Sequence, residues 1–554
     1  MEAHRVRSGD PGQPRSAPAL RASRGGRGAR AGRARGGRRK AGAHLQPRAR
    51  DRAADAGRQR EGARRRDPRI PARGRGVNVR RVVVVGGGVT GLVVAYRLLS
   101  AQKDARFEVT LLESRPRLGG NIQTEREGGF VIDGGPDSFV VAKPQATDLC
   151  KELGLGERLI VTTPKNRRVY VPRRGALHTL PEGLVLAVPT RFLPFAKTPL
   201  FSLPGKARMA LDLVLPKRPK EKGDESIGSF LQRRLGKEAV DILGEPLLGG
   251  IYAGDVDLLS IRSTFPQLAA LEDNHGSLIR GAIAERRKKG TTKGPPPSPF
   301  HSLLGGMGEL IEALARRIEK AGGDIRVGAP VVSVERSSGA DASAPPRWVV
   351  RHGARDGQTE SIEADDVVMA APANAAASAL GDVDAELGAL LRGIPYLSTA
   401  TIVLAYARPD VPHPLDAVGV VIPKDERRRI LAATFISSKW TGRAPQDAAL
   451  VRVFVGGHRD PGALAATDEA LVSLAREELG SLIGVRAAPM LARVFRYEQA
   501  NAQPIVGHAA RVRRIRDISR RLPGLYFAGA AFDGVGIPDC VRQANEAAAA
   551  VAAR

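Results

Sequence analysis

The sequence predicts an α/β protein in which a dinucleotide-binding unit is assembled from distant parts of the chain. Three observations carry this prediction. An apolar run at 82–85 enters a glycine-rich turn and a helix-like stretch, with another strand-like stretch at 107–113. Strand-like and helix-like segments alternate again from 302 to 380. A second strand, glycine-rich turn and helix follow one another at 524–554.

The first element is a buried strand that leads through glycines into a helix. Residues 82–85 are all valine, as suits a parallel strand covered on both faces. Gly86, Gly88 and Gly91 then form a G-x-G-x-x-G pattern. Gly86 allows the tight turn, Gly88 lets a pyrophosphate approach the backbone, and Gly91 lets helix and strand pack closely. The N-terminus of the following helix offers free N–H groups to the anion.

An acidic residue at the end of the second strand completes the dinucleotide pattern. The stretch FEVTLLE ends in Glu113, 22 residues beyond Gly91. A carboxylate at this place can accept hydrogen bonds from the adenosine ribose. The glycines alone would be weak evidence, but two strands, a helix and an acid in register predict a dinucleotide site. This pattern leaves NAD and FAD open.

The segment after Glu113 distinguishes between these cofactors. It reads ESRPRLGGNIQTEREGGFVIDGGPDSF (113–139), with Arg117 before Gly119 and Gly120. The segment resembles the glutathione-reductase-type FAD proteins of the amine oxidase and phytoene desaturase superfamily, where E-x-x-x-R-x-G-G follows the first βαβ unit. The resemblance implies tightly held FAD whose flavin carries the redox chemistry. It also implies a Rossmann-like FAD-binding domain of discontinuous segments, an α+β substrate domain and a helical lobe.

The order of the predicted elements gives a domain plan. The FAD-binding domain takes residues 77–150, 301–380 and 510–554, because the strand–helix alternation resumes after an interruption. Residues 151–300 form a helical lobe that covers the substrate or rests on a membrane, and residues 381–509 form a substrate-binding sheet region.

Two further stretches narrow the superfamily. EPLLGGIYAGDVDLLSIRSTFPQL (245–268) and GAAFDGVGIPDC (529–540) resemble the corresponding segments of the oxygen-dependent porphyrinogen oxidases, and this resemblance extends over 80–554. It implies oxidation of coproporphyrinogen III or protoporphyrinogen IX to the porphyrin in haem synthesis. Six electrons would pass to three O2, giving three H2O2, through hydride transfer from a meso carbon to flavin N5. An amine oxidase or a carotenoid desaturase shares both glycine motifs and remains the alternative.

The resemblance assigns the cofactor contacts position by position. Val331 would reach the adenine through its backbone, and Ala530 departs from the Asn or Ser common in relatives. The expected FAD-binding residues are Gly86, Gly87, Gly88, Val89, Thr90, Gly91, Glu113, Ser114, Arg117, Gly119, Gly120, Asn121, Gly135, Pro136, Asp137, Ser138, Val331, Gly529, Ala530, Gly534, Val535, Gly536 and Ile537.

The second glycine-rich segment is expected to serve the flavin end of the same cofactor. The helix after Pro538 would point its positive N-terminus at the flavin pyrimidine and favour negative charge on the reduced ring. Gly534 and Gly536 would keep Cβ atoms away from that ring. Cys540 would be a packing residue rather than a redox partner.

The substrate site needs apolar walls for a tetrapyrrole and a cation for its propionates. By resemblance to an arginine- and aromatic-rich strand of the family, Arg168 is the expected propionate anchor, with a solvated strand edge as the alternative. Gly250 belongs to the family's signature region, and Leu397 with Phe435 or Ile436 would sandwich a pyrrole ring, unless these three simply pack in the core. The flavin needs no protein nucleophile, so we expect no catalytic residue beyond it and no metal.

Composition limits the partners and the compartment. The chain has 554 residues, enough for two or three lobes, and no apolar run of 18 that would predict a transmembrane helix. Two cysteines, Cys150 and Cys540, suit a reducing compartment. We therefore expect a cytoplasmic protein that takes a tetrapyrrole and molecular oxygen. Peripheral contact with the inner face of the cell membrane and a homodimer are left open.

Most of the excess charge lies in the first 76 residues. They hold 22 Arg, one Lys and six acidic residues, a net +17 of the chain's +29. This Arg-, Gly-, Ala- and Pro-rich stretch predicts disorder, because it has too little apolar surface to fold. Nucleic-acid binding, a transit segment and an upstream translation start are the other interpretations. Without interleaved aromatic residues we expect no nucleic-acid partner.

Overall fold

The computed structural model describes residues 79–101, 106–219, 221, 223–288, 297–337, 347–354, 357–381 and 383–554. These residues all belong to one unit, Gly74–Arg554. The predicted basic tail, residues 1–76, lies outside the described residues.

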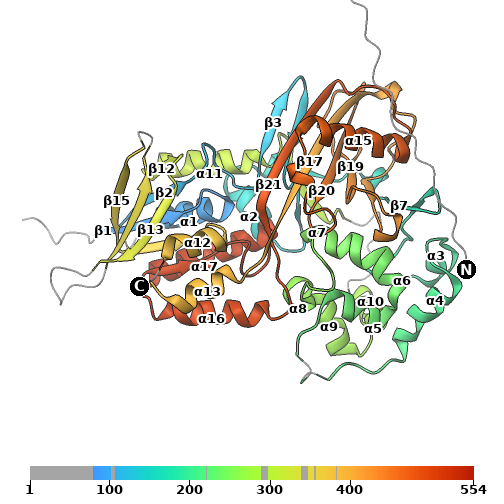
Figure 1. Cartoon of the computed structure of the whole chain (residues 1–554), viewed down its shortest axis with the longest axis horizontal. Coiled ribbons are helices and arrows are strands. Elements are labelled where there is room, and N and C mark those ends of the chain that lie inside the picture. The colour runs from blue at the N-terminus through green and yellow to red at the C-terminus, as the bar shows by residue number, and fades with distance from the viewer. Residues whose placement is uncertain are drawn as a thin grey trace, which may run out of the picture. The chain divides into compact units, whose positions relative to one another are not determined.

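A parallel five-stranded sheet forms the half of this unit that contains the first glycine motif (Figure 1). All four neighbouring pairs of strands are parallel, in the order β12-β2-β1-β16-β22. The strands are β1 (Val79–Val85), β2 (Arg106–Glu113), β12 (Asp324–Val327), β16 (Asp366–Met369) and β22 (Leu525–Phe527). The predicted α/β class is confirmed, and the sheet takes strands from three separate stretches of the chain.

Each face of this sheet is covered, and alternate valines of β1 serve opposite faces. Val82 and Val84 belong to a core with α1, α2, α11 and α17, whereas Val83 and Val85 belong to a core with β14, α12, α13 and α16. This alternation follows from the two-residue period of a strand and explains why the run is wholly apolar. The covering elements are α1 (Val89–Ser100), α2 (Gln145–Glu152), α11 (Gly308–Lys320), α17 (Ile537–Ala553), β14 (Trp348–Gly353), α12 (Ala373–Leu380), α13 (Ala385–Arg392) and α16 (His508–Arg520).

A seven-stranded mixed sheet forms the second half, with the order β21-β17-β20-β19-β18-β7-β8. Its central strands are long and apolar, and α15 packs on one face. The hairpin of β7 and β8 joins this sheet through parallel pairing of β7 with β18, although the domain plan grouped it with the helical lobe. The elements are β7 (Val169–Arg173), β8 (Ala176–Thr179), β17 (Tyr396–Ala407), β18 (Gly419–Val421), β19 (Ala432–Phe435), β20 (Ala448–Gly456), β21 (Leu491–Ala502) and α15 (Asp468–Ile483).

A helical lobe with its own core lies below this sheet in the view of Figure 1. Arg234 and Asp212 form an ion pair inside it, with Nε donating to the carboxylate at 2.5 Å, and both side chains are fully buried. A ten-residue π-helix, η5 (Val240–Gly249), includes the first five residues of the predicted signature region. The α-helices are α3 (Phe192–Lys197), α4 (Leu203–Ala210), α5 (Ile227–Leu235), α6 (Lys237–Ala239), α7 (Gly250–Tyr252), α8 (Ile261–Thr264), α9 (Pro266–His275) and α10 (Leu278–Lys288).

Short strands connect these parts. They are β3 (Thr124–Glu127) with β4 (Phe130–Asp133), β5 (Phe139–Val140) with β11 (Phe300–Leu303) and β6 (Leu159–Val161), β9 (Leu184–Val185) with β10 (Val188–Pro189), and β13 (Val331–Arg336) with β14 and β15 (Thr359–Ala364). Within the described part of the chain, no helix is both long and apolar enough to span a membrane.

Candidate active site

The first glycine motif forms a turn whose three glycines have different surroundings. Gly86 has a φ of +112°, which the tight turn requires. A Cβ on Gly91 would lie 1.9 Å from the Gly86 carbonyl oxygen, so this glycine allows α1 to pack against the turn. A Cβ on Gly88 would meet nothing within 4 Å. The space beside Gly88 is therefore open, and it belongs to a cavity.

Glu113 ties the end of β2 to this turn. Its carboxylate accepts a hydrogen bond from the Gly87 N–H at 2.7 Å and another from the Arg115 N–H at 2.8 Å. The side chain is buried but still lines the cavity. Because a carboxylate offers about four lone-pair positions, Glu113 can hold the loop and still accept a hydrogen bond from a ligand.

The C-terminal glycine segment also lines this cavity. Ala530, Val535 and Ile537 line it, and α17 starts at Ile537 without a side-chain cap. A Cβ on Gly534 would lie 2.8 Å from the Asp539 side chain, and one on Gly536 would lie 3.1 Å from it. These glycines therefore make room for the Asp539 carboxylate, and their expected clearance for the flavin ring stays a prediction.

Asp539 sits in the first turn of α17, where its charge opposes an incoming anion. Lys143 offsets this charge, because its ammonium group donates to both carboxylate oxygens at 2.7 Å. Cys540 lines the cavity as a buried thiol, and burial raises its pKa to about 11. At neutral pH the residue is therefore an uncharged packing group.

The cofactor cavity, as we call this space, has a volume of about 610 Å³. It runs from the α1 glycines past Val331 to the C-terminal segment. A second cavity of about 530 Å³ lies next to it. Six residues line both spaces, so the two cavities meet along one wall; they are Asn121, Pro136, Ala500, Ala502, Ala530 and Val535.

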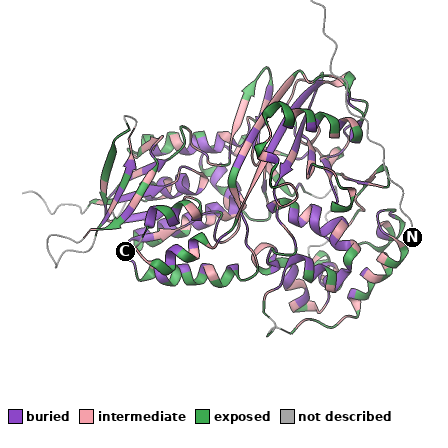
Figure 2. Cartoon of the chain, viewed as in Figure 1, coloured by how far each residue is buried: buried purple, intermediate pink, exposed green. Residues whose placement is uncertain are grey.

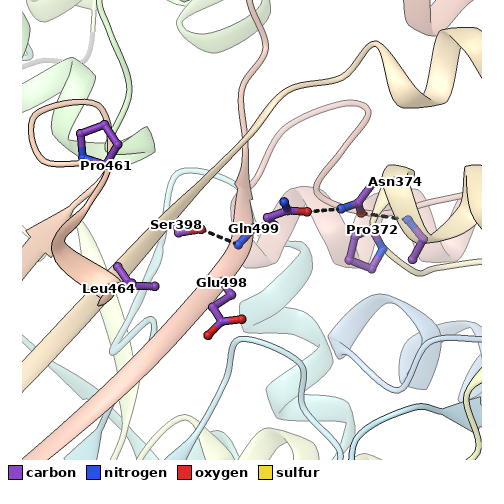
Figure 3. Close-up of a pocket in the computed structure, with 8 residues that line it drawn as sticks. Pro372, Asn374, Ser398, Pro461, Leu464, Glu498 and Gln499 are labelled. Atoms are coloured by element: carbon purple, nitrogen blue, oxygen red, sulfur yellow. Dashed lines mark hydrogen bonds between the residues drawn. The ribbon is translucent and has the colours of Figure 1, made fainter. Parts of the chain in front are cut away.

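A third hollow of about 520 Å³ opens beside the cofactor cavity (Figure 3) and shares four lining residues with it, Pro372, Ala375, Glu498 and Gln499. Gln499 has a φ of +42°, which is unusual for a residue with a side chain. Its N–H donates to Ser398 Oγ at 2.8 Å, and its side-chain oxygen accepts from Asn374 Nδ2 at 2.8 Å (Figure 3). The pairing of β17 with β21 shifts register at the neighbouring residue pair, so these bonds fix a bulge at the cavity wall.

The inner face of the seven-stranded sheet forms one wall of the second cavity. The residues that face the cavity alternate along three strands: Thr399 and Thr401 on β17, Ala432 and Thr434 on β19, and Arg452 and Phe454 on β20. The residues between them face the core under α15. The opposite wall comes from the π-helix and α7, where Pro246, Leu247, Gly250, Ile251 and Tyr252 line the cavity.

Four buried charged side chains and the half-buried Lys439 lie at or next to this cavity. Asp137 accepts hydrogen bonds from Lys439 Nζ at 2.9 and 3.0 Å and pairs with Arg452 at 3.2 Å. Arg443 pairs with Asp133 at 3.1 Å. Burial alone would raise the pKa of Asp137, but Lys439 and Arg452 outweigh it and hold that pKa well below its usual value. Three cations thus face two carboxylates, and Asp137 stays ionised.

Most of the predicted cofactor residues line one of the two cavities. In the cofactor cavity these are Gly86, Gly88, Val89, Thr90, Glu113, Ser114, Gly119, Gly120, Asn121, Pro136, Val331, Ala530, Val535 and Ile537. Gly135, Asp137 and Ser138 line the second cavity. Gly87, Gly91, Arg117, Gly529, Gly534 and Gly536 are outside both linings. Among these, Arg117 donates to the Leu118 and Ile122 carbonyl oxygens at 3.4 and 3.3 Å.

The predicted substrate residues separate more widely. Gly250 lines the second cavity, and the Leu397 carbonyl accepts from Asn501, which lines it too. Phe435 and Ile436 are buried in two core clusters and do not line the cavity. Arg168 is 57% exposed and pairs with Asp416 at 3.4 Å, also outside the lining.

Sequence reasoning missed Arg452 and Tyr497, which both line the second cavity. A signal for Arg452 was present, because LVRVFVG places a charged residue inside an otherwise apolar strand. Its guanidinium donates to the Asp133 and Gly135 carbonyl oxygens at 2.6 Å. Tyr497 gave no signal, because nothing local marks which face of β21 meets a cavity.

The residues present fit a flavin dinucleotide. The space beside Gly88 is open, and the first turn of α1 has neither a side-chain cap nor an acidic residue, so its N–H groups can receive a pyrophosphate. The cavity continues from there to the uncapped N-terminus of α17. The cofactor cavity thus offers backbone donors at the first turns of both α1 and α17.

Comparison with known proteins agrees with this geometry. The family described as "Flavin containing amine oxidoreductase" matches residues 89–552. Coproporphyrinogen III oxidase of Bacillus subtilis (strain 168) is 35% identical over 474 residues, which cover 84% of this chain and 97% of that protein. Mitochondrial protoporphyrinogen oxidase of Nicotiana tabacum is 29% identical, covering 83% of this chain and 92% of that protein. A crystal structure named "Putative protoporphyrinogen oxidase", from Exiguobacterium sp. 255-15, is 34% identical with a TM-score of 0.74, covering 85% and 98% of the two chains.

Proposed function

The chain belongs to the flavin-containing amine oxidoreductases and, within them, to the porphyrinogen oxidases, and from this premise we propose how its two cavities divide the work. Its cofactor is FAD, and its reaction is the oxidation of a porphyrinogen to the porphyrin with O2 as acceptor. The FAD-binding half holds the cofactor in the first cavity, and the sheet and the helical lobe hold the substrate in the second.

The contact between the cavities is the observation that carries this assignment. Ala530 and Val535, from the segment predicted to meet the flavin, line both spaces. A tetrapyrrole in the second cavity would therefore lie against the reacting end of the cofactor, while the adenosine end stays near Glu113. The side chains on this wall are small, so a flat macrocycle can approach closely.

The protein contributes binding, orientation and exclusion of water. FAD, when bound, accepts a hydride from the substrate and passes the electrons to oxygen. The apolar wall of Pro246, Leu247 and Ile251 removes water from one side of the substrate. Asp137 stays ionised beside Lys439 and Arg452, so it is a fixed charge rather than a proton donor.

We infer that coproporphyrinogen III is the preferred substrate. The curated relatives of Bacillus subtilis and Staphylococcus aureus, 35% and 32% identical, are named coproporphyrinogen III oxidases. Coproporphyrinogen carries four propionates against two in protoporphyrinogen, and the excess of three cations over two carboxylates beside the second cavity favours the more anionic molecule.

The test uses the purified, FAD-loaded enzyme. Coproporphyrinogen III should bleach the visible flavin absorption under anaerobic conditions, and readmitted oxygen should restore it with formation of coproporphyrin III. In competition, coproporphyrinogen should exceed protoporphyrinogen in kcat/KM. Absence of bleaching with either porphyrinogen would refute the enzymatic function, whereas a preference for protoporphyrinogen would refute the substrate choice alone.

We also propose peripheral membrane contact through the outer helices of the lobe. Phe192, Leu193, Leu203 and Val214 are 57–79% exposed on or beside α3 and α4, where Figure 2 shows exposed positions on the right of the view. Such a group of apolar side chains is typical of an interaction surface. Flotation with anionic phospholipid vesicles should recover the protein, and the paired change F192S/L203S should abolish recovery without changing porphyrinogen oxidation. A homodimer stays a prediction.

A further inference from the structure

Tyr497 lies on β21 with its side chain against the second cavity. The residue is only 5% exposed, and its hydroxyl lies 3.2 Å from the position that a Cβ on Gly135 would take. Gly135 lines the same cavity. The tyrosine is therefore buried next to the wall where substrate and cofactor would meet.

The hydroxyl of Tyr497 is buried without a hydrogen-bond partner among the described residues. Buried polar groups in native proteins are nearly always paired, so an exception requires an explanation. Burial raises the pKa of this hydroxyl against the opposing effect of Arg452 and Arg117. At neutral pH the group is consequently a protonated donor that lacks an acceptor.

The charges around this hydroxyl are mainly positive. Arg452, Arg117 and Arg115 all act electrostatically on Tyr497, and Asp133 opposes them. Arg452 lines the same cavity, and its Nε is also buried without a partner. Buried charges are normally balanced. In the neighbouring charge group, however, Lys439, Arg443 and Arg452 have only the carboxylates of Asp133 and Asp137 as partners. The missing acceptor is therefore expected to be an anion.

We propose that the Tyr497 hydroxyl and the Arg452 guanidinium form a subsite for one carboxylate of the tetrapyrrole. This inference rests on the proposed function and assigns one end of the substrate within the second cavity. Tyr497 donates its hydroxyl hydrogen to the carboxylate, and Arg452 supplies the compensating charge. The subsite orients the macrocycle and leaves the flavin chemistry unchanged.

The placement of Tyr497 favours the substrate over the cofactor as its partner. Tyr497 lines the second cavity and is not among the residues that line the cofactor cavity. The two neighbouring threonines, Thr399 and Thr401, line the same space. Thr401 donates its hydroxyl to the Gly134 carbonyl oxygen at 2.8 Å, so it is already engaged. Thr399 Oγ1 accepts a hydrogen bond from Asn501 Nδ2 at 3.0 Å, whereas the Tyr497 hydroxyl is buried without a partner among the described residues.

The chain offers a matched control in Tyr406. Its hydroxyl is also buried without a partner, and burial raises its pKa to about 12. Tyr406 is 1% exposed and packs in the core under α15, away from both cavities. Tyr497→Phe and Tyr406→Phe each remove one unpaired hydroxyl, so neither should lower the melting temperature of the FAD-loaded protein. Only the first should alter ligand binding.

The experiment measures binding of coproporphyrin III and of its tetramethyl ester, in one detergent, to the FAD-loaded wild type and both variants. We expect Y497F to weaken the free acid about tenfold, which corresponds to about 1.4 kcal/mol, and to leave the ester within about twofold of wild type. Y406F should match wild type for both ligands. The acid-selective loss would identify the carboxylate as the partner of the hydroxyl.

Three results would overturn the subsite. Y497F could bind the acid as wild type does, lose acid and ester equally, or alter FAD affinity and the flavin spectrum while porphyrin binding stays the same. The last result would assign the hydroxyl to the cofactor. Failure of the wild type to oxidise any porphyrinogen would instead overturn the proposed function, and the subsite with it.

Discussion

Substitution of single glycines in the first motif separates folding from cofactor binding. In Gly91→Ala, the new Cβ would lie 1.9 Å from the Gly86 carbonyl oxygen, 3.1 Å from the Gly86 carbonyl carbon and 3.2 Å from Val84 Cγ1. A carbon and an oxygen in contact normally stay about 3.3 Å apart. Helix α1 must therefore move away from β1 by more than an ångström, although it is packed on both sides by α11 and α17.

The magnitude follows from the rigidity of this contact. Overpacking in a well-packed core costs about 1–3 kcal/mol, and more where the obstacle is backbone. Here the nearest atoms belong to the backbone of the turn, which cannot rotate away as a side chain would. We expect G91A to lower the free energy of unfolding of the apoprotein by about 3 kcal/mol or more.

Gly88→Ala provides the comparison. Nothing lies within 4 Å of its Cβ position, and the backbone there has a φ of −71° and a ψ of 176°, which alanine adopts readily. The new methyl group would project into space that a pyrophosphate needs. We expect G88A to unfold within about 0.5 kcal/mol of wild type as apoprotein, while its FAD affinity falls about tenfold or more.

Urea denaturation of the two apoproteins and titration with FAD give both quantities. The reasoning would be refuted if G91A were as stable as wild type, because the backbone contact would then not be limiting. It would also be refuted if G88A kept full FAD affinity, because the space beside Gly88 would then not receive the cofactor.

Three further expectations concern buried ionisable groups. Lys439→Met leaves the buried Asp137 with a weaker partner set and should destabilise the protein by about 3–5 kcal/mol in denaturant titration. Because folding lowers the pKa of Asp137, the ionised carboxylate stabilises the protein fully above the usual Asp pKa of about 3.9, and this stabilisation is lost as the pH falls below that value. Asp137→Asn should therefore flatten the dependence of the free energy of unfolding on pH in this acidic range. Burial raises the pKa of Cys150 to about 12 and of Cys540 to about 11, so neither should react with a thiol reagent at pH 8 until the protein is denatured, and rapid labelling of the native protein would contradict this.

The cofactor half could be predicted from the sequence because its signals are local. The valine run, the three glycines and Glu113 stand within 32 residues, and each has a direct counterpart in the structure. The expected clearance that Gly534 gives the flavin ring stays a prediction, and the structure adds a contact that the sequence did not indicate: a Cβ on Gly534 would also meet Asp539.

The substrate half was harder to predict because strand alternation does not reveal which face meets a cavity. On β19, Phe435 was expected at the substrate, but the structure turns it toward α15 and presents Thr434 instead. Arg168 was assigned by resemblance to an arginine- and aromatic-rich strand of the family, but it lies just before β7, next to the edge strand of the sheet, where Asp416 pairs with it. Which face of a strand meets the cavity depends on contacts between segments that are far apart in the sequence, and no short stretch of a single sequence reveals those contacts.

The order of the strands in the parallel sheet has a consequence for biosynthesis. Strand β1 lies between β2 and β16, and α17 packs on α1, so the glycine turn meets its final neighbours only after the end of the chain is made. At about 5–20 residues per second, the interval between synthesis of Val85 and of Ile537 is roughly 20 to 90 s. During that interval the nascent chain has one half of a cofactor site and no second wall. Flavin uptake is thus expected after release from the ribosome, and a chain shortened before Leu525 should emerge colourless.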